Sequence, residues 1–303
     1  MPEEDDGIWF RESFSDYIIF ENKMEKVYFT GHSKFQKIDI VKLKNWGKTL
    51  YLDSKIQSSQ IDERVYHESL VHPSLLLHPN PENVLIIGGG EGATLREVLK
   101  YKQVKSATMV DIDGELVDMC KRYMPEWSSG AFEDKRTELI IDDAKKFIEN
   151  SDKRFDIIIS DLTEPLDDGP SKYLFTVEYY QKLYDLLKPE GVIVLQSGPA
   201  FTGLLGFMGS VNQTLKQVFD EVIPYQSFVL SFSMMWGFNL GFKGLSHKEE
   251  SLKIGERIKE RDIELEFLSS DYIKGMMLLP KAILKELNKG KISTDKNPFV
   301  WDF

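Results

Sequence analysis

The 303-residue sequence contains a single cysteine, Cys120. One cysteine cannot form an internal disulfide or a CxxC metal site, which favours a reducing compartment, so we expect a cytoplasmic protein. No apolar run approaches the roughly 20 residues that a membrane-spanning helix needs. The N-terminal residues 1–6 are acidic, so we expect neither a secretion signal nor a membrane segment.

Basic residues are also scarce. The chain has 38 Lys and Arg against 49 Asp and Glu, a formal charge of −11. It offers no broad basic surface to neutralise a phosphate backbone, so we do not expect a nucleic-acid partner. The excess of negative charge suits amines or metal cations better than nucleotides or acids.

The N-terminal part of the chain is rich in β-type alternation. Two strand-like runs, "FQKIDIVKL" and "GKTLYLDSKIQ", flank a turn at residues 45–47. We therefore predict a small antiparallel β domain over residues 1–62. A helical stretch follows at residues 62–77, and we expect Pro73 to interrupt its continuity.

The remainder, residues 63–303, alternates buried strands with amphipathic helices. The five expected strands are "NVLIIGGG", "SATMVDID", "TELIID", "FDIIISD" and "GVIVLQSG". This alternation predicts an α/β, Rossmann-like domain with a mostly parallel sheet. The charged stretch at residues 246–262 is typical of a solvated helix or loop.

A glycine turn ends the first of these strands and opens a helix. Gly88 and Gly90 allow the backbone to approach a nucleotide closely, and Asp111 ends the next strand, where a carboxylate can bind ribose hydroxyls. Dinucleotide, adenosyl and purely structural interpretations stay open at this point. Glu91 would repel a pyrophosphate, which favours a cationic, phosphate-free adenosyl ligand. Alternatively, Glu91 complements the dipole of the helix.

Two more strand ends carry acidic residues. Asp161 and Glu164 follow the fourth strand, and their position suits a general base or ammonium recognition. A metal site is the rival interpretation, but no histidine lies nearby in the sequence, so we expect no metal. Asp142 and Asp143 follow the third strand, where they could reach an adenine amino group or act as ordinary helix N-caps.

Five motifs together resemble the polyamine aminopropyltransferases, the spermidine synthase family. They run in family order between residues 28 and 243: "KFQKIDI", "GKTLYLDSKIQ", "YHESLVHP", "GGGEGATLREVLK" with "VDID", and "FDIIISDLTEPLDDGPSKYLFTVEYY". The resemblance implies a class I methyltransferase-like fold and transfer of the aminopropyl group of decarboxylated S-adenosylmethionine to a di- or polyamine. Putrescine would yield spermidine, or spermidine a longer polyamine such as thermospermine, with release of methylthioadenosine. It also implies no metal or other cofactor and a homodimer or homotetramer joined through the N-terminal strands.

The same resemblance implies roles for individual residues. It assigns catalysis to Asp161 as base, assisted by Tyr66. It assigns donor binding to Gln36, Gly88, Gly90, Glu91, Asp111, Asp142 and Asp143, and acceptor binding to Gln57, His67, Glu164, Phe232 and Trp236. Tyr66 and His67 also have plain structural interpretations, as a core or rim tyrosine and a satisfied buried histidine.

The sequence departs from the family pattern at the acceptor side. Glu91 and Glu164 stand where the family commonly has aspartate, and Phe232 or Ser231 stands where many members have a pocket tyrosine. These features, with Trp236, look closest to the archaeal and thermospermine synthase branch. Alternatively, Met234, Met235 and Trp236 are plain core residues. Several acceptors stay open: putrescine, agmatine, cadaverine, spermidine and norspermidine.

The main alternative function is S-adenosylmethionine-dependent methyl transfer, because that class shares the glycine turn, the ribose acid and the fold. Glu91 argues against it. The carboxylate of intact S-adenosylmethionine would face Glu91, whereas the decarboxylated donor presents an ammonium that can form a charge-assisted hydrogen bond.

Overall fold

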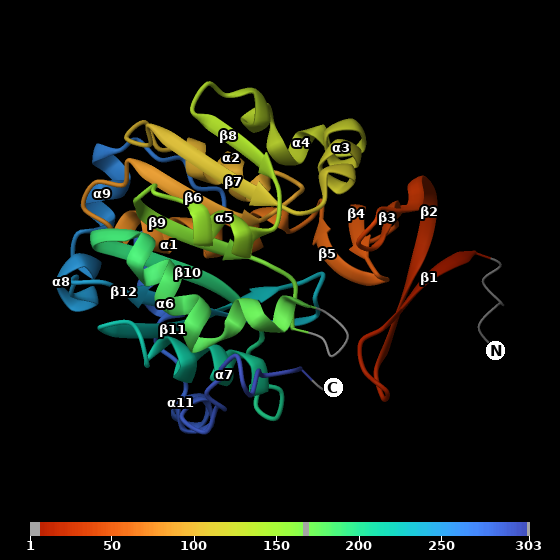
Figure 1. Cartoon of the computed structure of the whole chain (residues 1–303). Helices are drawn as coiled ribbons and strands as arrows, with labels where there is room; N and C mark the ends of the chain where they lie inside the picture. The colour runs from red at the N-terminus through yellow and green to blue at the C-terminus, as the bar shows by residue number, and fades with distance from the viewer. Residues whose placement is uncertain (1–6, 166–169, 302–303) are drawn as a thin grey trace.

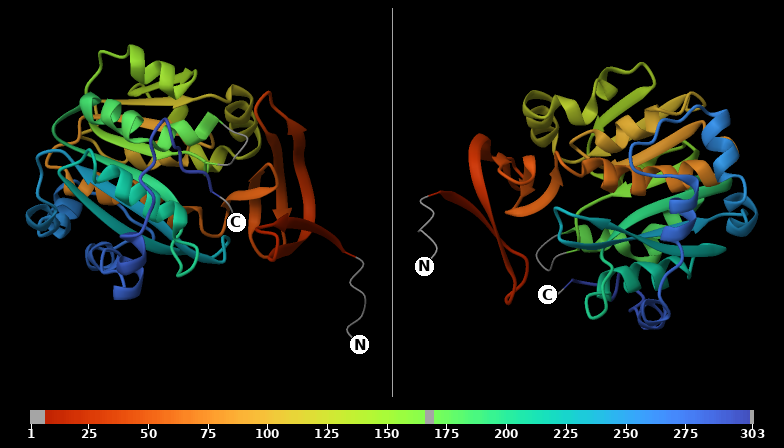
Figure 2. Two further views of the ribbon diagram at one scale, coloured as in Figure 1. Left: turned by 60° about the horizontal axis from the view of Figure 1, so that its bottom comes forward. Right: turned by 180° about the vertical axis from the view of Figure 1, so that it is seen from behind.

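A computed structural model describes residues 7–165 and 170–301. It contains two β-sheets, and Figures 1 and 2 show the smaller N-terminal sheet standing opposite the carboxyl ends of the parallel strands of the larger one. The smaller sheet is antiparallel, with its strands in chain order. These strands are β1 (Ile8–Ser13), β2 (Ile19–His32), β3 (Lys37–Leu43), β4 (Gly47–Leu52) and β5 (Lys55–Ser59). The predicted division of the chain at residues 62 and 63 stays a prediction.

The run "GKTLYLDSKIQ" is two strands rather than one. Asp53 and Ser54 both adopt positive φ, at 46° and 63°, and form the two-residue turn between β4 and β5. Two consecutive positive φ values match the twist of a tight hairpin, for which Asp is a favoured first residue. The turn brings the side chains of β5 back beside β4.

The larger sheet has seven strands in the order β11-β12-β10-β9-β6-β7-β8. The five from β10 to β8 are parallel, which confirms the predicted Rossmann-like class, and β12 and β11 add to the β10 edge as an antiparallel hairpin that the sequence analysis did not anticipate. The strands are β6 (Asn83–Gly88), β7 (Ser106–Asp111), β8 (Thr137–Ile141), β9 (Phe155–Asp161), β10 (Leu187–Pro199), β11 (Glu221–Val229) and β12 (Met234–Phe242).

Helices cover both faces of this sheet. One face packs on α1 and α2 and the other on α5, α6 and α7, with alternate residues of each buried strand facing each layer. The α-helices are α1 (Glu63–Leu77), α2 (Ala93–Leu99), α3 (Gly114–Tyr123), α4 (Pro125–Ser128), α5 (Ala144–Asn150), α6 (Val177–Leu186), α7 (Gly206–Leu215), α8 (His247–Ser251), α9 (Ile254–Glu260), α10 (Ser270–Met276) and α11 (Lys281–Leu287). The 3₁₀ turns are η1 (Ala131–Glu133) and η2 (Pro170–Phe175). Among the described residues, none of these helices has the length and apolar character needed to cross a bilayer.

Helix α1 continues through Pro73, so the predicted interruption is wrong. A proline within a helix leaves the carbonyl four residues earlier without its usual donor. That carbonyl belongs to Ser69, and the hydroxyl of Tyr225 on β11 donates to it at 2.8 Å. A contact from a distant strand therefore compensates for the missing backbone hydrogen bond.

The charged stretch at residues 246–262 is not simply solvated. It forms α8 and α9, and Arg257 and Arg261 are buried against the end of α1. Arg261 donates to the carbonyl oxygens of Leu75, His78 and Pro79, and Arg257 donates to those of Leu76 and Leu77. Two arginines thus satisfy the carbonyls that a helix leaves free at its C-terminus. The sequence analysis expected these charged residues to be solvated. They instead hold the C-terminal end of α1, the helix that carries Tyr66 and His67.

We expect Arg261→Met to lower the free energy of unfolding by about 2–4 kcal/mol, because it leaves buried carbonyl oxygens without a charged donor. Urea denaturation measures the loss. Arg154→Met is the matched control, because Arg154 is exposed and donates only to neighbouring backbone carbonyls. Equal stability of the two variants would contradict a capping role for Arg261.

Candidate active site

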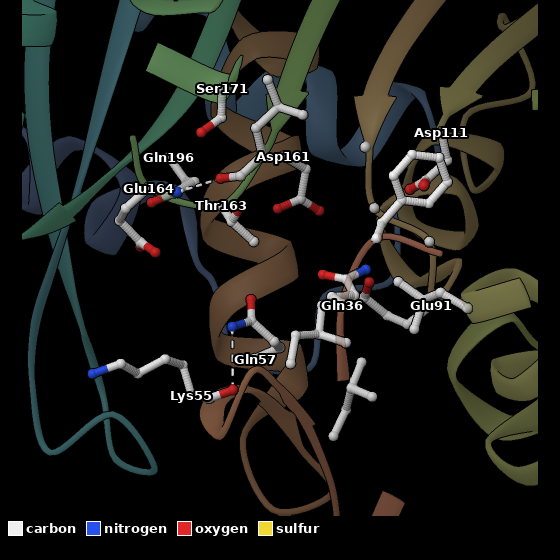
Figure 3. A pocket seen from close by; sticks show the side chains of 18 of the residues that line it. Gln36, Lys55, Gln57, Glu91, Asp111, Asp161, Thr163, Glu164, Ser171 and Gln196 are labelled. Carbon is white, nitrogen blue, oxygen red and sulfur yellow. Dashed lines mark hydrogen bonds between the residues drawn. The ribbon is translucent and has the colours of Figure 1, made fainter. Parts of the chain in front are cut away.

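A cavity of about 540 Å³ lies between the two sheets, at the carboxyl ends of β6, β7 and β9. Among the described residues its lining is acidic, with six carboxylates against two lysines. The acids are Glu12, Glu91, Asp111, Asp143, Asp161 and Glu164, and the lysines are Lys55 and Lys145. Figure 3 shows Asp111 and Glu91 towards one end, and Glu164 and Lys55 towards the other. The acidic lining suits a cationic ligand.

The glycine turn between β6 and α2 lies directly against the end of β9. Gly88 has φ +82°, and a Cβ there would lie 2.2 Å from the carbonyl oxygen of Asp161. Only glycine fits such a position. The turn therefore presents its backbone to the cavity and leaves Glu91, 9% exposed, as the first side chain that projects from it.

Asp111 ends β7 at the same edge of the sheet. Its Oδ1 accepts a hydrogen bond from the backbone N–H of Asp113 at 2.8 Å, and burial raises its pKa to about 6. Gln36, from the N-terminal sheet, lines the cavity and donates to Asp113 Oδ2 at 2.9 Å. Gln36 and Asp111 are separated by 75 positions in the chain, but both form hydrogen bonds to Asp113. They are therefore held close together at the edge of the cavity.

Asp161 is held by two hydroxyl donors. Tyr66 Oη donates to Oδ1 at 2.7 Å, and Thr94 Oγ1 donates to Oδ2 at 2.6 Å. Burial, then the negative charge of Glu91, raises the pKa of Asp161, while the hydroxyl donors and His67 oppose that rise. The sequence analysis named Tyr66 but missed Thr94, which no motif distinguishes from other helix residues. The carboxylate is fixed in orientation and its basicity is raised above that of a free aspartate.

His67 lies behind Glu91 rather than in the lining of the cavity, and it is completely buried. Its Nε2 lies 2.9 Å from Glu91 Oε1, and its Nδ1 lies 2.6 Å from the carbonyl oxygen of Glu63. A carbonyl only accepts, so Nδ1 carries a proton, and Nε2 faces a carboxylate. Contacts with Glu63 and Glu91 outweigh burial and raise the pKa of His67 to about 10. His67 is therefore a buried cation that supports Glu91.

This protonation bears on metal binding. His67, Glu91 and Asp161 have potential ligand atoms within 4.8 Å of one another, although the sequence places no histidine beside Asp161. An imidazole binds metal only through an unprotonated nitrogen. Because both nitrogens of His67 face oxygen acceptors, the geometry favours an ion pair over a metal centre.

The raised pKa of His67 predicts a pH-dependent stability. The imidazolium stabilises the fold fully below about pH 6.5, the ordinary pKa of histidine, and this stabilisation is lost as the pH rises towards about 10. We expect His67→Gln to cost about 3 kcal/mol at pH 6, with the cost shrinking towards pH 10. Urea denaturation of both proteins across this range measures the difference. A cost that does not change with pH would show that His67 is neutral.

The other end of the cavity combines acids with aromatic side chains. Glu164 lies there, and burial raises its pKa. Phe232 and Trp236 are buried core residues that also line the cavity, with ring centroids 4.7 Å apart, whereas Met234 and Met235 are partly buried, pack against the core and are not in the lining. The core interpretation therefore holds for Trp236 as well, and its role in acceptor binding stays a prediction.

Two contacts fix the segment that carries Phe232. Ser231 donates its backbone N–H and its hydroxyl to Asp62, just before α1, at 2.6 and 2.9 Å. Phe232 also packs edge-on against Tyr66. Ser231 and Phe232 both line the cavity, but the Ser231 hydroxyl is already bonded within the protein.

The N-terminal sheet supplies residues at this end that the sequence analysis missed. Gln57, which it did name, lines the cavity and donates to the backbone carbonyl of Lys55 at 3.2 Å. Glu12, on β1, also lines the cavity, accepts from the Ile56 N–H at 3.1 Å, and has its pKa raised by burial to about 7. Its place could have been predicted from the sequence, because strand alternation puts Glu12 on the same face as Phe10 and Phe14, which are half-buried and buried.

Asp142 and Asp143 differ in position. Asp143 lines the cavity and is the N-cap of α5, where it accepts from the Lys145 N–H at 2.8 Å. Asp142 is exposed and is not part of the lining, although its backbone N–H donates to the carbonyl oxygen of Asp111. The helix-cap alternative thus describes Asp143. Residues 166–169 of the "LDDGPSKYLFT" motif lie outside the described residues.

The fold and the site together define a class. The parallel sheet carries a glycine turn and, at the end of the next strand, an acid suited to bind ribose hydroxyls. The cavity beside them is lined with acids, and the turn itself, residues 88–92, has no cation that could bind phosphate. This combination is typical of transferases that use an adenosyl sulfonium donor.

Comparison with known proteins gives the family. Residues 63–249 match the spermine/spermidine synthase domain, and residues 8–60 match the spermidine synthase tetramerisation domain. A polyamine aminopropyltransferase of Saccharolobus islandicus is 43% identical over 296 residues, 96% of this chain and 97% of that protein. One from Sulfurisphaera tokodaii is 41% identical with the same coverage. The chain therefore belongs to the spermine/spermidine synthase family.

Solved structures support the same family assignment. Spermidine synthase from Thermotoga maritima superposes with a TM-score of 0.86 at 32% identity, covering 93% of this chain and 94% of that one. A spermidine synthase in complex with the transition-state analogue AdoDATO gives 0.87 at 32% identity, with 95% and 96% covered. These findings confirm the resemblance seen in the sequence and favour aminopropyl transfer over methyl transfer.

Proposed function

We propose that this protein transfers the aminopropyl group of decarboxylated S-adenosylmethionine to a primary amine and releases methylthioadenosine. The observation that carries the proposal is the pair of carboxylates at the glycine turn. Glu91 projects from the turn, and Asp161 lies close enough for its pKa to be raised by that charge. An ammonium on the donor would neutralise Glu91, whereas the carboxylate of intact S-adenosylmethionine would face it.

The reaction needs a neutral amine. The lone pair of the acceptor nitrogen attacks the carbon beside the sulfonium, the C–S bond breaks, and its electrons neutralise the sulfur. An alkyl ammonium has a pKa of about 10.4, so reaching the neutral form at pH 7 costs about 4.6 kcal/mol. Asp161 accepts the displaced proton, and its fixed orientation and raised pKa make it a better base than a free aspartate. Tyr66 and Thr94 hold it in place.

The remaining residues divide along the cavity. On the donor side we propose that Asp111 holds the ribose, the backbone at Gly88 and Gly90 lies against the donor, and Gln36 and Asp143 close around it. We propose no direct donor contact for Asp142, because it is not part of the cavity lining and its Oδ1 accepts a hydrogen bond from the Asp143 N–H. On the acceptor side we propose Gln57, Glu164, Phe232 and Trp236, with Glu12 added. His67 acts through Glu91 rather than by touching the acceptor.

We also propose that the protein forms a homodimer or homotetramer through the N-terminal sheet. Ile8, Trp9, Ile19 and Val27 on β1 and β2 are large apolar residues that are 46–68% exposed. Exposed apolar side chains gathered on one sheet are typical of an interface. The expected cytoplasmic location stays a prediction.

The test is an assay of purified protein with decarboxylated S-adenosylmethionine and a panel of amines. We expect methylthioadenosine release and a product heavier than the acceptor by one aminopropyl group. The same rate in the presence of EDTA is expected, because no step needs a metal. Release of S-adenosylhomocysteine from intact S-adenosylmethionine, without methylthioadenosine formation, would overturn the proposal.

A further inference from the structure

Asp113 lies beside the donor end of the cavity but is not part of its lining. It is 1% exposed and is the N-cap of α3, where its Oδ1 accepts a hydrogen bond from the Leu116 N–H at 3.0 Å. Its backbone N–H donates to Asp111 Oδ1 at 2.8 Å. Its second carboxylate oxygen, Oδ2, contacts the loop of residues 33–36, which joins β2 to β3.

That loop holds Gln36 against Asp113. The Ser33 hydroxyl donates to Asp113 Oδ2 at 2.6 Å, and Gln36 Nε2 donates to the same oxygen at 2.9 Å. Ser33 Oγ also accepts from the backbone N–H of Phe35 at 3.1 Å and from that of Gln36 at 3.2 Å. A serine that bonds to its own loop in this way fixes the backbone of a short turn. The backbone and the side chain of Gln36 therefore both have defined positions.

The contact with Asp113 decides which end of the Gln36 amide faces the ligand. A side-chain amide has an NH₂ group, which donates hydrogen bonds, and an oxygen, which accepts them. A carboxylate oxygen accepts, so the NH₂ group of Gln36 turns to Asp113 and the amide oxygen turns away from it. In Figure 3 this oxygen lies on the side of Asp161, and the nitrogen lies on the side of Asp111. Because Gln36 lines the cavity, it offers an acceptor to the ligand.

We propose that Asp113 is a positioning residue, which fixes the Gln36 amide so that its oxygen accepts a hydrogen bond from the adenosyl donor. The inference rests on the proposed aminopropyl transfer. The decarboxylated donor has two kinds of group that can donate this bond, the ammonium of its aminopropyl arm and the hydroxyls of its ribose. Figure 3 shows Gln36 at the same end of the cavity as Glu91 and Asp111, the acids proposed for these groups.

Asp113→Asn tests the proposal because it keeps the helix cap and reverses the amide. Asparagine is as good an N-cap as aspartate, and its oxygen can still accept from the Leu116 N–H. Its NH₂ group then takes the place of Oδ2 and faces Gln36. Two NH₂ groups cannot bond to each other, so the Gln36 amide turns over and presents its NH₂ group to the cavity.

The experiment measures Kd by calorimetric titration with decarboxylated S-adenosylmethionine and with methylthioadenosine, which keeps the ribose but lacks the ammonium. We expect Asp113→Asn to weaken binding of the decarboxylated donor about tenfold, the effect of one lost hydrogen bond. An equal loss for methylthioadenosine would assign the bond to the ribose, and an unchanged Kd for it would assign the bond to the ammonium. Asp118→Asn removes an exposed acid from the same helix and should leave both Kd values unchanged.

A double-mutant cycle separates positioning from a direct effect of the Asp113 charge. Gln36→Leu removes the amide without a change of charge and should weaken binding of the decarboxylated donor to the same extent. In the Gln36→Leu protein, Asp113→Asn should cause no further loss, because no amide is left to turn. A tenfold loss from Asp113→Asn in both backgrounds overturns the inference, and so does an unchanged affinity of the Asp113→Asn protein for the decarboxylated donor. Failure of the wild-type protein to bind either ligand would instead refute the proposed function, so the two failures are distinguishable.

Discussion

Asp161→Asn is expected to lower kcat by a factor of about 10²–10⁴, the range for loss of a general base. Asparagine has nearly the same shape but cannot accept the proton of the attacking amine. It also offers one acceptor oxygen where Tyr66 and Thr94 now find two, so one hydroxyl loses its partner. Steady-state release of methylthioadenosine measures the effect.

Two further variants show whether that loss is specific to the base. Tyr66→Phe removes one orienting hydrogen bond while leaving the base, so we expect a smaller loss of about tenfold. Asp152→Asn is a control, because Asp152 is an exposed aspartate before β9. Asp161→Asn with wild-type kcat, and with a wild-type urea midpoint, would remove Asp161 from the mechanism.

Glu91→Gln is expected to change the affinities for two donors in opposite directions. Loss of a charge-assisted hydrogen bond should raise KM for decarboxylated S-adenosylmethionine by about 10- to 100-fold. The affinity for intact S-adenosylmethionine should rise, because its carboxylate no longer faces a negative charge. Calorimetric titration with each donor measures the two affinities.

Only Glu91 should show this reversal. Glu115→Gln removes an exposed acid from the first turn of α3, and we expect it to leave both affinities unchanged. Glu91→Gln also leaves the buried His67 cation facing a neutral amide oxygen in place of a carboxylate, so some loss of stability is expected. Parallel weakening of both donors would mean that Glu91 supports the fold and does not discriminate between them.

The strand ends of the catalytic sheet could be predicted because their signals are local. A buried apolar run that ends in glycine or aspartate predicts both the strand and the residue at its carboxyl end, as at Gly88, Asp111 and Asp161. The order of the parallel strands then brings these ends to one edge. No distant contact is needed for this part of the prediction.

The rest of the site depends on contacts between distant segments. Thr94, Glu12 and Lys55 acquire their positions through pairing and packing that no short motif records. The same holds for the continuity of α1, where Tyr225 supplies the donor for Ser69. His67 was named from the family resemblance, but its position behind Glu91 depends on the packing of α1 against the glycine turn. Partners from other elements override local propensity in each case.

The composite nature of the cavity has a consequence for how such enzymes diversify. The proposed donor end is built mainly by the catalytic domain, with Gln36 added from the N-terminal part, whereas three polar residues of the proposed acceptor end, Glu12, Lys55 and Gln57, belong to the N-terminal sheet. Substrate range can therefore change by substitution on two edge strands without disturbing the adenosyl-binding machinery. The same sheet carries the exposed apolar residues proposed for subunit contact. A chimera that takes its N-terminal sheet from a relative would therefore acquire both the acceptor preference and the quaternary structure of that relative.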